Sequence, residues 1–157
     1  MKIILMVVGK TSTEALAGEI EKYARRITHY LPFEIKVIPD IKKGKAFDPV
    51  KQKIAEGELL LKEIERPDTV ILLDERGREM TSREFAAFVD KKVSVQARNI
   101  FFVVGGPYGF SEDVYRRADG MMSLSKMTFP HEMVRLFFVE QLYRAMTILR
   151  GEPYHHD

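Results

Sequence analysis

The sequence contains no cysteine, and this absence excludes several kinds of chemistry at once. Disulfide bonds, zinc sites with thiolate ligands and thiol nucleophiles all require a sulfhydryl group that the chain does not have. A chain without cysteine is also compatible with a reducing compartment. Any catalytic chemistry therefore depends on other side chains or on the backbone.

Long apolar runs are also missing from the chain. No stretch approaches the roughly 20 consecutive apolar residues that a membrane-spanning helix needs, so we expect a soluble protein with no membrane partner. The apolar N-terminus, MKIILMVVGK, is short, and Gly9 and Lys10 follow it without a small-residue cleavage pattern. We therefore predict a buried first strand there and no signal peptide.

A marked excess of one charge is absent as well. The 25 Lys and Arg residues are nearly balanced by 23 Asp and Glu residues, which leaves a formal net charge of +2. This value is too small to indicate nucleic-acid binding by itself. Two local clusters could still meet phosphates, although charge runs of this size are usually solvated surface: Lys42, Lys43 and Lys45, and Arg25 with Arg26.

The chain does contain a regular alternation of short apolar runs and longer segments of helical periodicity. We predict strands over residues 3–8, 33–38, 69–74, 99–104 and 120–125. We predict helices over residues 12–30, 49–65, 81–93 and 129–150, and a short helix after Ser111. No repeat, linker or change of composition divides the 157 residues. The sequence therefore predicts a single α/β domain over residues 1–157, with a mostly parallel, helix-covered sheet.

Two further patterns concern the predicted helices. Capping signals stand at Ser12 or Thr13, at Asp48 before Pro49, at Thr81 with Glu84, and at Ser111. The last helix has an apolar stripe that consists of Val134, Phe138, Leu142, Ala145 and Leu149. Additional apolar residues, such as Phe137, flank this stripe, so we expect part of the helix to pack against a second subunit.

Three loops that follow predicted strands have unusual compositions: those after Leu73-Asp74, Val104 and Leu124. In a parallel sheet such loops meet at the carboxyl edge, where ligands bind. Together they offer backbone groups and apolar side chains, with few charges. This combination suits an adenine ring or a nucleoside better than a triphosphate.

The glycine-rich loop within VVGGPYGFS, residues 103–111, does not match a known phosphate-binding pattern. Pro107 lacks the backbone donor that a dinucleotide fingerprint would need at this position. After Gly109 the chain continues with Phe110 and Ser111, where a P-loop has Lys followed by Ser or Thr. The loop is therefore shaped for a close approach of the backbone to a ligand, or it is a tight turn without a ligand.

Four motifs occur in order along the chain: LDERG, VGGPYGF, LSKMTFPHEMVRLFFVEQLYRA and the terminal PYHHD. Over essentially its whole length the chain thus resembles the ribosomal RNA large subunit methyltransferase H family, small SPOUT-class enzymes that methylate N3 of a pseudouridine in 23S rRNA. The resemblance implies an α/β fold with a C-terminal trefoil knot, a homodimer, and S-adenosylmethionine as cofactor. It also implies 23S rRNA within the ribosome as the partner, a cytoplasmic location and no metal.

The resemblance also implies which residues contact the cofactor. Motif by motif, these contacts fall on Leu73, Gly105, Leu124, Ser125, Lys126, Met127, Thr128 and Phe129. Most of them are expected to be backbone or apolar contacts.

Four residues are candidates for the substrate side of the site: His131, Arg135, Tyr154 and His155. Histidine titrates near neutral pH, and arginine has a planar, permanently charged fork that binds phosphates or bases. The tail follows Gly151 and Pro153, so its aromatic residues could stack on a splayed RNA base. The alternatives are local hydrogen bonds for His131, a surface ion pair for Arg135, and a frayed terminus or dimer contact for the tail.

Two other functions remain open at this point. A noncatalytic, ribosome-associated RNA-binding module would keep the basic clusters without needing the three-loop pocket. A nucleotide-binding or hydrolytic enzyme of flavodoxin-like architecture would need a phosphate loop or an acidic metal cluster, neither of which the sequence contains.

Overall fold

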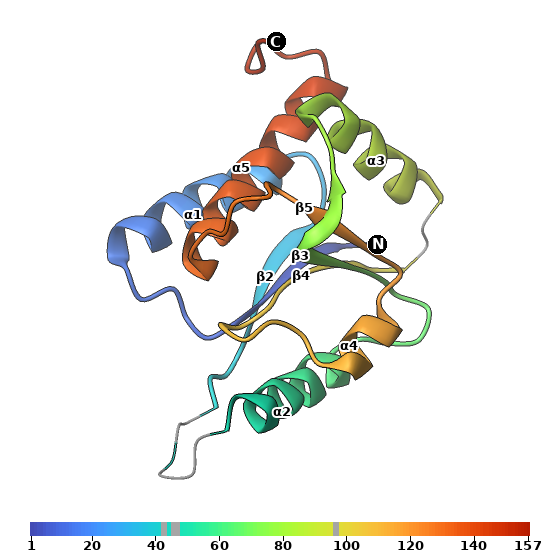
Figure 1. The fold of residues 1–157 in the computed structure, drawn as a ribbon. Helices are drawn as coiled ribbons and strands as arrows, with labels where there is room; N and C mark the ends of the chain where they lie inside the picture. Colours follow the sequence, from blue (N-terminus) through green and yellow to red (C-terminus); the bar gives the residue numbers. More distant parts are fainter. Residues whose placement is uncertain (42–43, 45–47, 96–97) are drawn as a thin grey trace.

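A parallel sheet forms the centre of the computed structural model, which describes residues 1–41, 44, 48–95 and 98–157 (Figure 1). Its strands are β1 (Ile3–Val8), β2 (Phe33–Ile38), β3 (Thr69–Glu79), β4 (Ile100–Val104) and β5 (Gly120–Ser123). They lie in the order β2-β1-β4-β3-β5, and every neighbouring pair is parallel. The carboxyl ends of the strands therefore lie at one edge of the sheet.

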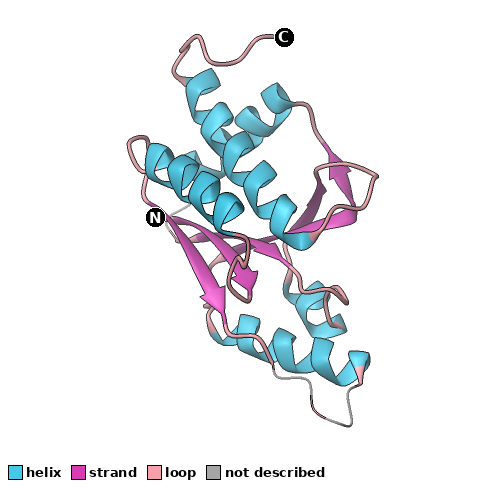
Figure 2. Ribbon diagram, turned by 90° about the vertical axis from the view of Figure 1, so that its left-hand side faces the viewer, coloured by secondary structure: helices cyan, strands magenta, loops and turns pink. Residues whose placement is uncertain are grey.

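Helices cover both faces of this sheet (Figure 2). One face carries α1 (Glu14–Ile27), α3 (Ser82–Val95) and α5 (His131–Leu149), and the other carries α2 (Pro49–Lys62) and α4 (Glu112–Arg117). On the first face, α5 contacts both α1 and α3. The predicted fold class, an α/β arrangement with a parallel, helix-covered sheet, is confirmed.

The strands β1 and β4 are buried along their whole length. In β1, Ile3, Leu5 and Val7 pack beneath α1, α3 and α5, whereas the alternate residues, such as Met6, pack beneath α2 and α4. Successive side chains of a strand point to opposite faces, so a strand with helices on both sides needs a continuous apolar run. This requirement explains why the uninterrupted runs in the sequence form the middle of the sheet.

The capping signals inside the second half of the chain are confirmed. Thr81 and Glu84 form both bonds of the capping box, with the Thr81 N–H donating to Glu84 Oε1 at 3.3 Å and the Glu84 N–H donating to Thr81 Oγ1 at 3.1 Å. Ser111 Oγ accepts from the Val114 N–H at 3.4 Å. Earlier in the chain, Asp48 Oδ1 accepts from the Val50 N–H at 2.9 Å at the start of α2.

The sequence ended the third strand at Asp74, but β3 continues to Glu79. After a register shift between Leu73 and Arg78, the strand pairs again with β5. Gly77 makes this possible, because a Cβ at that position would lie 2.6 Å from the backbone of Met122. The charged segment was expected to be a loop because it lacks the apolar pattern of a covered strand, and its exposed side chains agree with that composition.

The last helix follows its predicted stripe in the middle and departs from it at the ends. Phe138, Leu142 and Ala145 are fully buried, whereas Val134 is half-buried and Leu149 is 42% exposed. Phe138 packs on Phe102 of β4 with ring centroids 4.8 Å apart. The middle of α5 is therefore the part that joins the helical layer to the sheet.

The cap of α1 does not come from its own first residues. Thr13 is the N-cap residue, but its side chain makes no capping hydrogen bond. Instead, the carboxylate of Glu132, at the start of α5, accepts from the Ser12 N–H at 2.8 Å and from the Thr13 N–H at 3.4 Å. Ser12 Oγ also donates to this carboxylate at 2.8 Å. A residue distant in the sequence thus joins the beginnings of α1 and α5.

Replacing Glu132 with Gln should destabilise the protein at neutral pH, because an amide oxygen accepts hydrogen bonds more weakly than a carboxylate. We expect the free energy of unfolding to fall by about 0.5–1 kcal/mol. This value lies at the lower end of the range for a lost helix cap, because the Glu132 side chain is open to solvent. The hydrogen bond from Ser12 lowers the pKa of Glu132. The stabilisation that Glu132 contributes is therefore present above its unfolded-state pKa and is lost as the pH falls through its folded-state pKa.

Urea unfolding at pH 7 and at pH 3 measures this contribution. Glu58→Gln, on the exposed side of α2, is the matched control. A destabilisation by Glu132→Gln that is equally large at both pH values would contradict the role of the charged carboxylate.

Candidate active site

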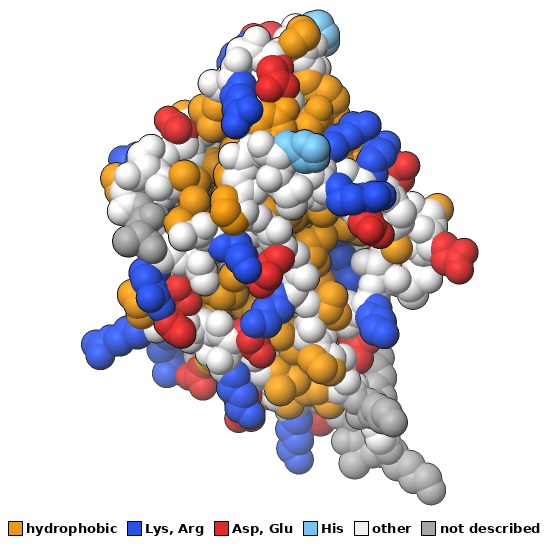
Figure 3. Space-filling view, turned by 180° about the vertical axis from the view of Figure 1, so that it is seen from behind, with side chains coloured by type: hydrophobic (Ala, Val, Ile, Leu, Met, Phe, Trp, Pro, Cys, Tyr) orange, Lys and Arg blue, Asp and Glu red, His pale blue; other side chains and the backbone are white. Residues whose placement is uncertain are grey.

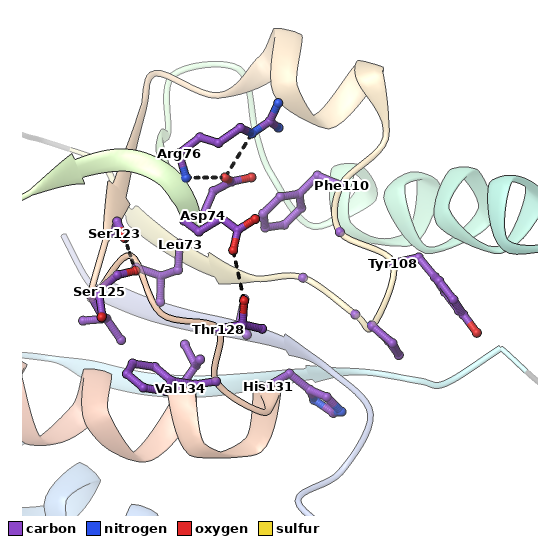
Figure 4. Close-up of a pocket in the computed structure, with 18 of the residues that line it drawn as sticks. Leu73, Asp74, Arg76, Tyr108, Phe110, Ser123, Ser125, Thr128, His131 and Val134 are labelled. Carbon is purple, nitrogen blue, oxygen red and sulfur yellow. Dashed lines mark hydrogen bonds and ion pairs between the residues drawn. The ribbon is translucent and has the colours of Figure 1, made fainter.

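A pocket of about 600 Å³ opens at the carboxyl edge of the sheet, where the irregular middle of β3 and the ends of β4 and β5 meet the start of α5 (Figure 4). Its walls come from the three loops that the sequence singled out. The lining residues are Leu73–Arg76, Val104–Phe110, Tyr115, Ser123–Ser125, Met127–Phe129, His131 and Val134. The expectation that the three loops form one pocket is confirmed.

The glycine loop forms one wall of the pocket. The Gly109 N–H donates to the Gly106 carbonyl at 3.1 Å, and Gly109 has a φ of 80°, a backbone conformation that favours glycine. The loop ends at Phe110, which is buried and packs edge-on against Tyr115 with ring centroids 5.7 Å apart. A Cβ on Gly105 would lie 3.2 Å from the Phe110 ring. The loop is therefore a compact turn, and the buried ring of Phe110 fixes the end of this turn beside the pocket.

The segment after β5 forms the opposite wall, and side chains shape its backbone. Ser123 Oγ donates to the Ser125 carbonyl at 2.7 Å, and Ser125 Oγ accepts from the Met127 N–H at 3.0 Å. Thr128 Oγ1 donates to Glu75 Oε2 at 3.3 Å, which joins this segment to the charged part of β3 (Figure 4). The segment is thereby fixed at both of its ends.

A charged cluster stands where β3 enters the pocket. Tyr115 donates its hydroxyl hydrogen to Asp74, and Arg76 donates to the same carboxylate from its backbone at 2.8 Å and from its side chain at 3.3 Å. Burial would raise the pKa of Asp74, but these hydrogen bonds outweigh it and leave the pKa below its usual value. Burial and the bond to Asp74 together raise the pKa of Tyr115. Asp74 is therefore held in its charged form.

The part of the pocket wall that residues 74–76 form carries a small net negative charge. Asp74 and Glu75 both contribute carboxylates, and the charge of Arg76 is balanced by Asp74. The Arg76 guanidinium also lies 4.9 Å from the ring centroid of Tyr115, as in a cation–π contact. Arg76 is therefore already engaged and is not free to bind an anion. Such a wall favours a ligand with positive charge over a polyphosphate.

Nearly all of the predicted cofactor residues line this pocket. Leu73, Gly105, Leu124, Ser125, Met127, Thr128 and Phe129 do so. Lys126 does not line it: its ammonium group points outward and lies 3.8 Å from Glu79 Oε1. Direct contact of these residues with a cofactor remains a prediction.

The predicted substrate-side residues are separated in the structure. His131 lines the pocket, but Arg135, one turn further along α5, is only 2% exposed. The Arg135 guanidinium donates to the Val8 and Gly9 carbonyls at 2.7 and 2.9 Å, and to Thr11 Oγ1 at 3.0 Å. Burial lowers its pKa. The interpretation of Arg135 as a phosphate or base ligand therefore disagrees with its position, since its fork already binds the end of β1.

The tail also lies away from the pocket within one chain. The Tyr154 hydroxyl donates to Glu140 Oε1 at 3.0 Å, and its ring packs edge-on against Tyr143 with centroids 4.8 Å apart. His155 Nδ1 lies 3.0 Å from the Arg144 guanidinium. Tyr154 and His155 are half-buried against α5, so the tail is neither frayed nor extended over the pocket of its own chain.

Only one of the two basic clusters lies within the described residues. Lys42, Lys43 and Lys45 lie outside the described residues, so only Arg25 and Arg26 can be placed. Both are exposed near the end of α1. Seen from behind, basic and acidic side chains are interspersed over the surface (Figure 3).

The described part of the chain contains neither a metal-binding cluster nor a membrane-spanning helix. In residues 1–41, 44, 48–95 and 98–157, no group of histidine and acidic side chains is arranged to hold a metal ion. Over the same residues, no helix has the length and apolar character needed to cross a membrane.

Comparison with known proteins relates this geometry to a family. The family model described as "Predicted SPOUT methyltransferase" matches residues 1–155. The chain is 54% identical over 157 residues to the ribosomal RNA large subunit methyltransferase H of Parabacteroides distasonis, with 100% of both chains covered. Proteins of the same name from Christiangramia forsetii and Porphyromonas gingivalis are each 52% identical, with 99% and 100% of both chains covered.

The chain belongs to the SPOUT methyltransferase family. The resemblance drawn from the four motifs is thereby confirmed. Among solved structures, Archaeoglobus fulgidus Nep1 bound to S-adenosylhomocysteine has a TM-score of 0.42 and 13% identity, and covers 90% of this chain and 77% of that chain. That likeness is too weak to bear on function.

Sequence reasoning missed the charged cluster of this SPOUT methyltransferase. Asp74 stands inside the LDERG motif, so its place at a strand end was a usable signal. Tyr115 lies on α4 and gave no signal, because its contact with Asp74 arises only when α4 packs beside β3. Long-range pairs of this kind depend on the folded chain.

Proposed function

We propose that the protein transfers a methyl group from S-adenosylmethionine to N3 of a pseudouridine in 23S ribosomal RNA. The observation that carries this proposal is the pocket that gathers nearly all of the expected cofactor residues. Membership of the SPOUT methyltransferase family supports methyl transfer, and full-length similarity to large-subunit rRNA methyltransferases supports the substrate. A noncatalytic RNA-binding module would have no need of such a pocket.

The pocket fits this cofactor in size, polarity and charge. Its volume of about 600 Å³ lies within the usual range for small-molecule sites. Leu73, Leu124 and Val134 offer apolar surface for a purine ring, and the backbone of the glycine loop offers polar groups at its edge. The carboxylates of Asp74 and Glu75 suit the positive charges of the amino acid part.

The chain itself has to orient the reactants more than to activate them. When bound, the cofactor supplies a methyl group that is already activated by a positively charged sulfur. The glycine loop and the segment 124–129 hold the two sides of the pocket, so the methyl group can be aligned with the acceptor nitrogen. Alignment of this kind can lower a barrier by about 7–11 kcal/mol in favourable cases.

His131 lines the pocket, and we assign it to the target base. Arg135 can only donate, so its contact with His131 Nδ1 at 3.4 Å requires Nδ1 to accept and leaves the ring proton on Nε2. In this tautomer His131 can donate a hydrogen bond to the base, which stabilises the anion that forms when N3 gives its proton to solvent water. Arg135 then acts as a positioning residue for His131.

Replacing Gly105 with Val should weaken S-adenosylmethionine binding at least about tenfold, because the branched side chain must enter the pocket or displace Phe110. Calorimetry measures the affinity, and circular dichroism on the same sample monitors the fold. Gly18→Val, on α1, is the control, because a Cβ at Gly18 would have nothing within 4 Å. Unchanged affinity in the Gly105 variant would remove the glycine loop from the cofactor site.

The reaction is tested with ribosomes from a strain that lacks the modification. Incubation with labelled S-adenosylmethionine should transfer label to 23S rRNA, and mass spectrometry should map it to N3 of one pseudouridine. The Gly105→Val protein serves as the inactive control. Tight cofactor binding without transfer to 23S rRNA would refute the substrate assignment, and ATP binding without S-adenosylmethionine binding would refute the whole proposal.

The proposal includes the homodimer and the trefoil knot that the family resemblance implies. Exposed apolar side chains beside the pocket favour an interface: Met127 is 75%, Met121 37% and Phe137 36% exposed. A second cavity of about 410 Å³ adjoins the first and includes Phe85, Phe129 and Phe137 in its lining. A second copy of the chain would cover this patch.

In such a dimer the tail would serve the pocket of the partner. Tyr154 bonds to Glu140, which lies about 14 Å along α5 from His131 at the usual helical rise. Within one chain the tail aromatic groups therefore do not meet the methyl donor. A two-fold assembly can bring the tail of each subunit to the pocket of the other.

Mixing two inactive proteins tests this arrangement. Gly105→Val has an intact tail and a blocked pocket, whereas a chain without residues 153–157 has an intact pocket and no tail. After equal mixing and subunit exchange, half of the dimers should carry one complete site, which restores about a quarter of the wild-type rate. Light scattering checks the dimer mass, and exchanged mixed dimers that remain inactive would refute the tail's role across subunits.

A further inference from the structure

A buried glutamate lies beneath the glycine loop and has no part in the site described above. Glu56, on α2, is only 3% exposed and does not line the pocket. α2 covers the face of the sheet opposite to α5. Glu56 therefore approaches the glycine loop from behind, on the side away from the ligand.

The contact between Glu56 and the loop is close. A Cβ built on Gly106 would lie 2.4 Å from Glu56 Oε2 and 2.8 Å from Oε1. The next residue of α2, Gly57, meets the far end of the loop in the same way, since a Cβ there would lie 2.5 Å from Ser111 Oγ. One turn of α2 thus supports the glycine loop at both of its ends.

One oxygen of this carboxyl group is not engaged. Oε1 accepts from Gln52 Nε2 at 3.4 Å, whereas Oε2 has no hydrogen-bond partner within the part of the chain that the structure describes. Burial raises the pKa of Glu56, and the charge of Asp40, in the segment after β2, raises it further, while the bond from Gln52 opposes both. A buried carboxyl group with a free oxygen is unfavourable for stability, which is typical of groups kept for function.

We propose that Glu56 is a positioning residue for methyl transfer, whose carboxyl group holds Gly106 and thereby keeps the glycine loop in the shape that receives the cofactor. The inference rests on the assignment of this loop to the cofactor site in the proposed function. Glu56 touches neither cofactor nor RNA and acts through the backbone of Gly106.

Three substitutions separate shape, charge and position. Glu56→Gln keeps the shape and cannot ionise, so it should bind S-adenosylmethionine within about threefold of wild type. Glu56→Ala removes the carboxyl group from beneath the loop, and Glu56→Asp moves this group away from the loop by the length of one methylene group. Both should weaken binding at least about tenfold and raise KM for the cofactor, with little change in KM for the ribosome.

The pH dependence of binding provides a readout that a purely structural residue would not affect. Burial raises the pKa of Glu56, so the stability that this group contributes is present below the unfolded-state pKa and declines as the pH rises through the raised folded-state pKa. Under the proposal the neutral form supports the loop, so the cofactor affinity of the wild type declines over the same pH range. The affinity of Glu56→Gln relative to wild type should therefore increase with pH. Asp40 is the charged group that acts on Glu56, and Asp40→Asn should move this pH profile to lower values.

A double variant tests whether the effect passes through Gly106. Gly106→Ala alone should weaken binding, because its methyl group would collide with the Glu56 carboxyl group. In the Gly106→Ala, Glu56→Ala protein that collision is gone, so binding should be no weaker than in Glu56→Ala alone. Additive losses would overturn the route through Gly106.

The controls distinguish this inference from the proposed function. Glu58→Ala, exposed on the same helix, should leave cofactor affinity unchanged. If Gly105→Val binds the cofactor normally, the glycine loop is not the cofactor site and both proposals fail. If Gly105→Val loses binding while Glu56→Ala, or Glu56→Asp where the alanine variant does not fold, binds like wild type, only the role of Glu56 is overturned.

Discussion

A buried guanidinium group ties the beginning of α5 to the end of β1. Arg135 donates to the Val8 and Gly9 carbonyls and to Thr11 Oγ1, all within 3.0 Å. A strand that ends inside a protein leaves carbonyls without ladder partners, and burying them unpaired is destabilising. The planar fork of arginine satisfies several acceptors with one side chain, which offsets the desolvation of its charge.

The first turn of α5 is used for more than this bond. Next to Arg135 in space, His131 faces the pocket, and Glu132 caps α1 across a distance of 120 residues in sequence. On the other face of the sheet, α2 supports the glycine loop through Glu56 and Gly57. Helices on both faces therefore hold the loops of the pocket, which explains how a site made largely of backbone can keep a defined shape.

The sequence predicted those features that depend on local pattern. The strands at 3–8 and 33–38 have the predicted bounds, because a covered strand has a continuous or alternating apolar run. The extension of β3 could not be predicted in this way, since Gly77 has meaning only beside the backbone of Met122. The partner of Glu132 was equally hidden, because a cap contributed by another helix leaves no local pattern.

Arg135 differs from these cases, because its burial could have been inferred. It lies three, four and seven residues before Phe138, Val139 and Leu142, which are all fully buried on α5. A helix presents such positions on one face, so the periodicity placed Arg135 on the buried stripe. The general preference of arginine for solvent and phosphate favoured a ligand role, which disagrees with its buried position.

The chain separates the groups that line the pocket from the aromatic groups of the tail. Asp74, fixed in its charged form by Tyr115 and Arg76, and the glycine loop lie at one end of α5, whereas Tyr154 packs on Tyr143 near the other end. Within the described residues of one chain, α5 lies between these two groups and is joined to the sheet by Phe138. Under the proposed function, a complete site therefore arises only on assembly. This arrangement would keep a bound methyl donor away from RNA until two subunits have met.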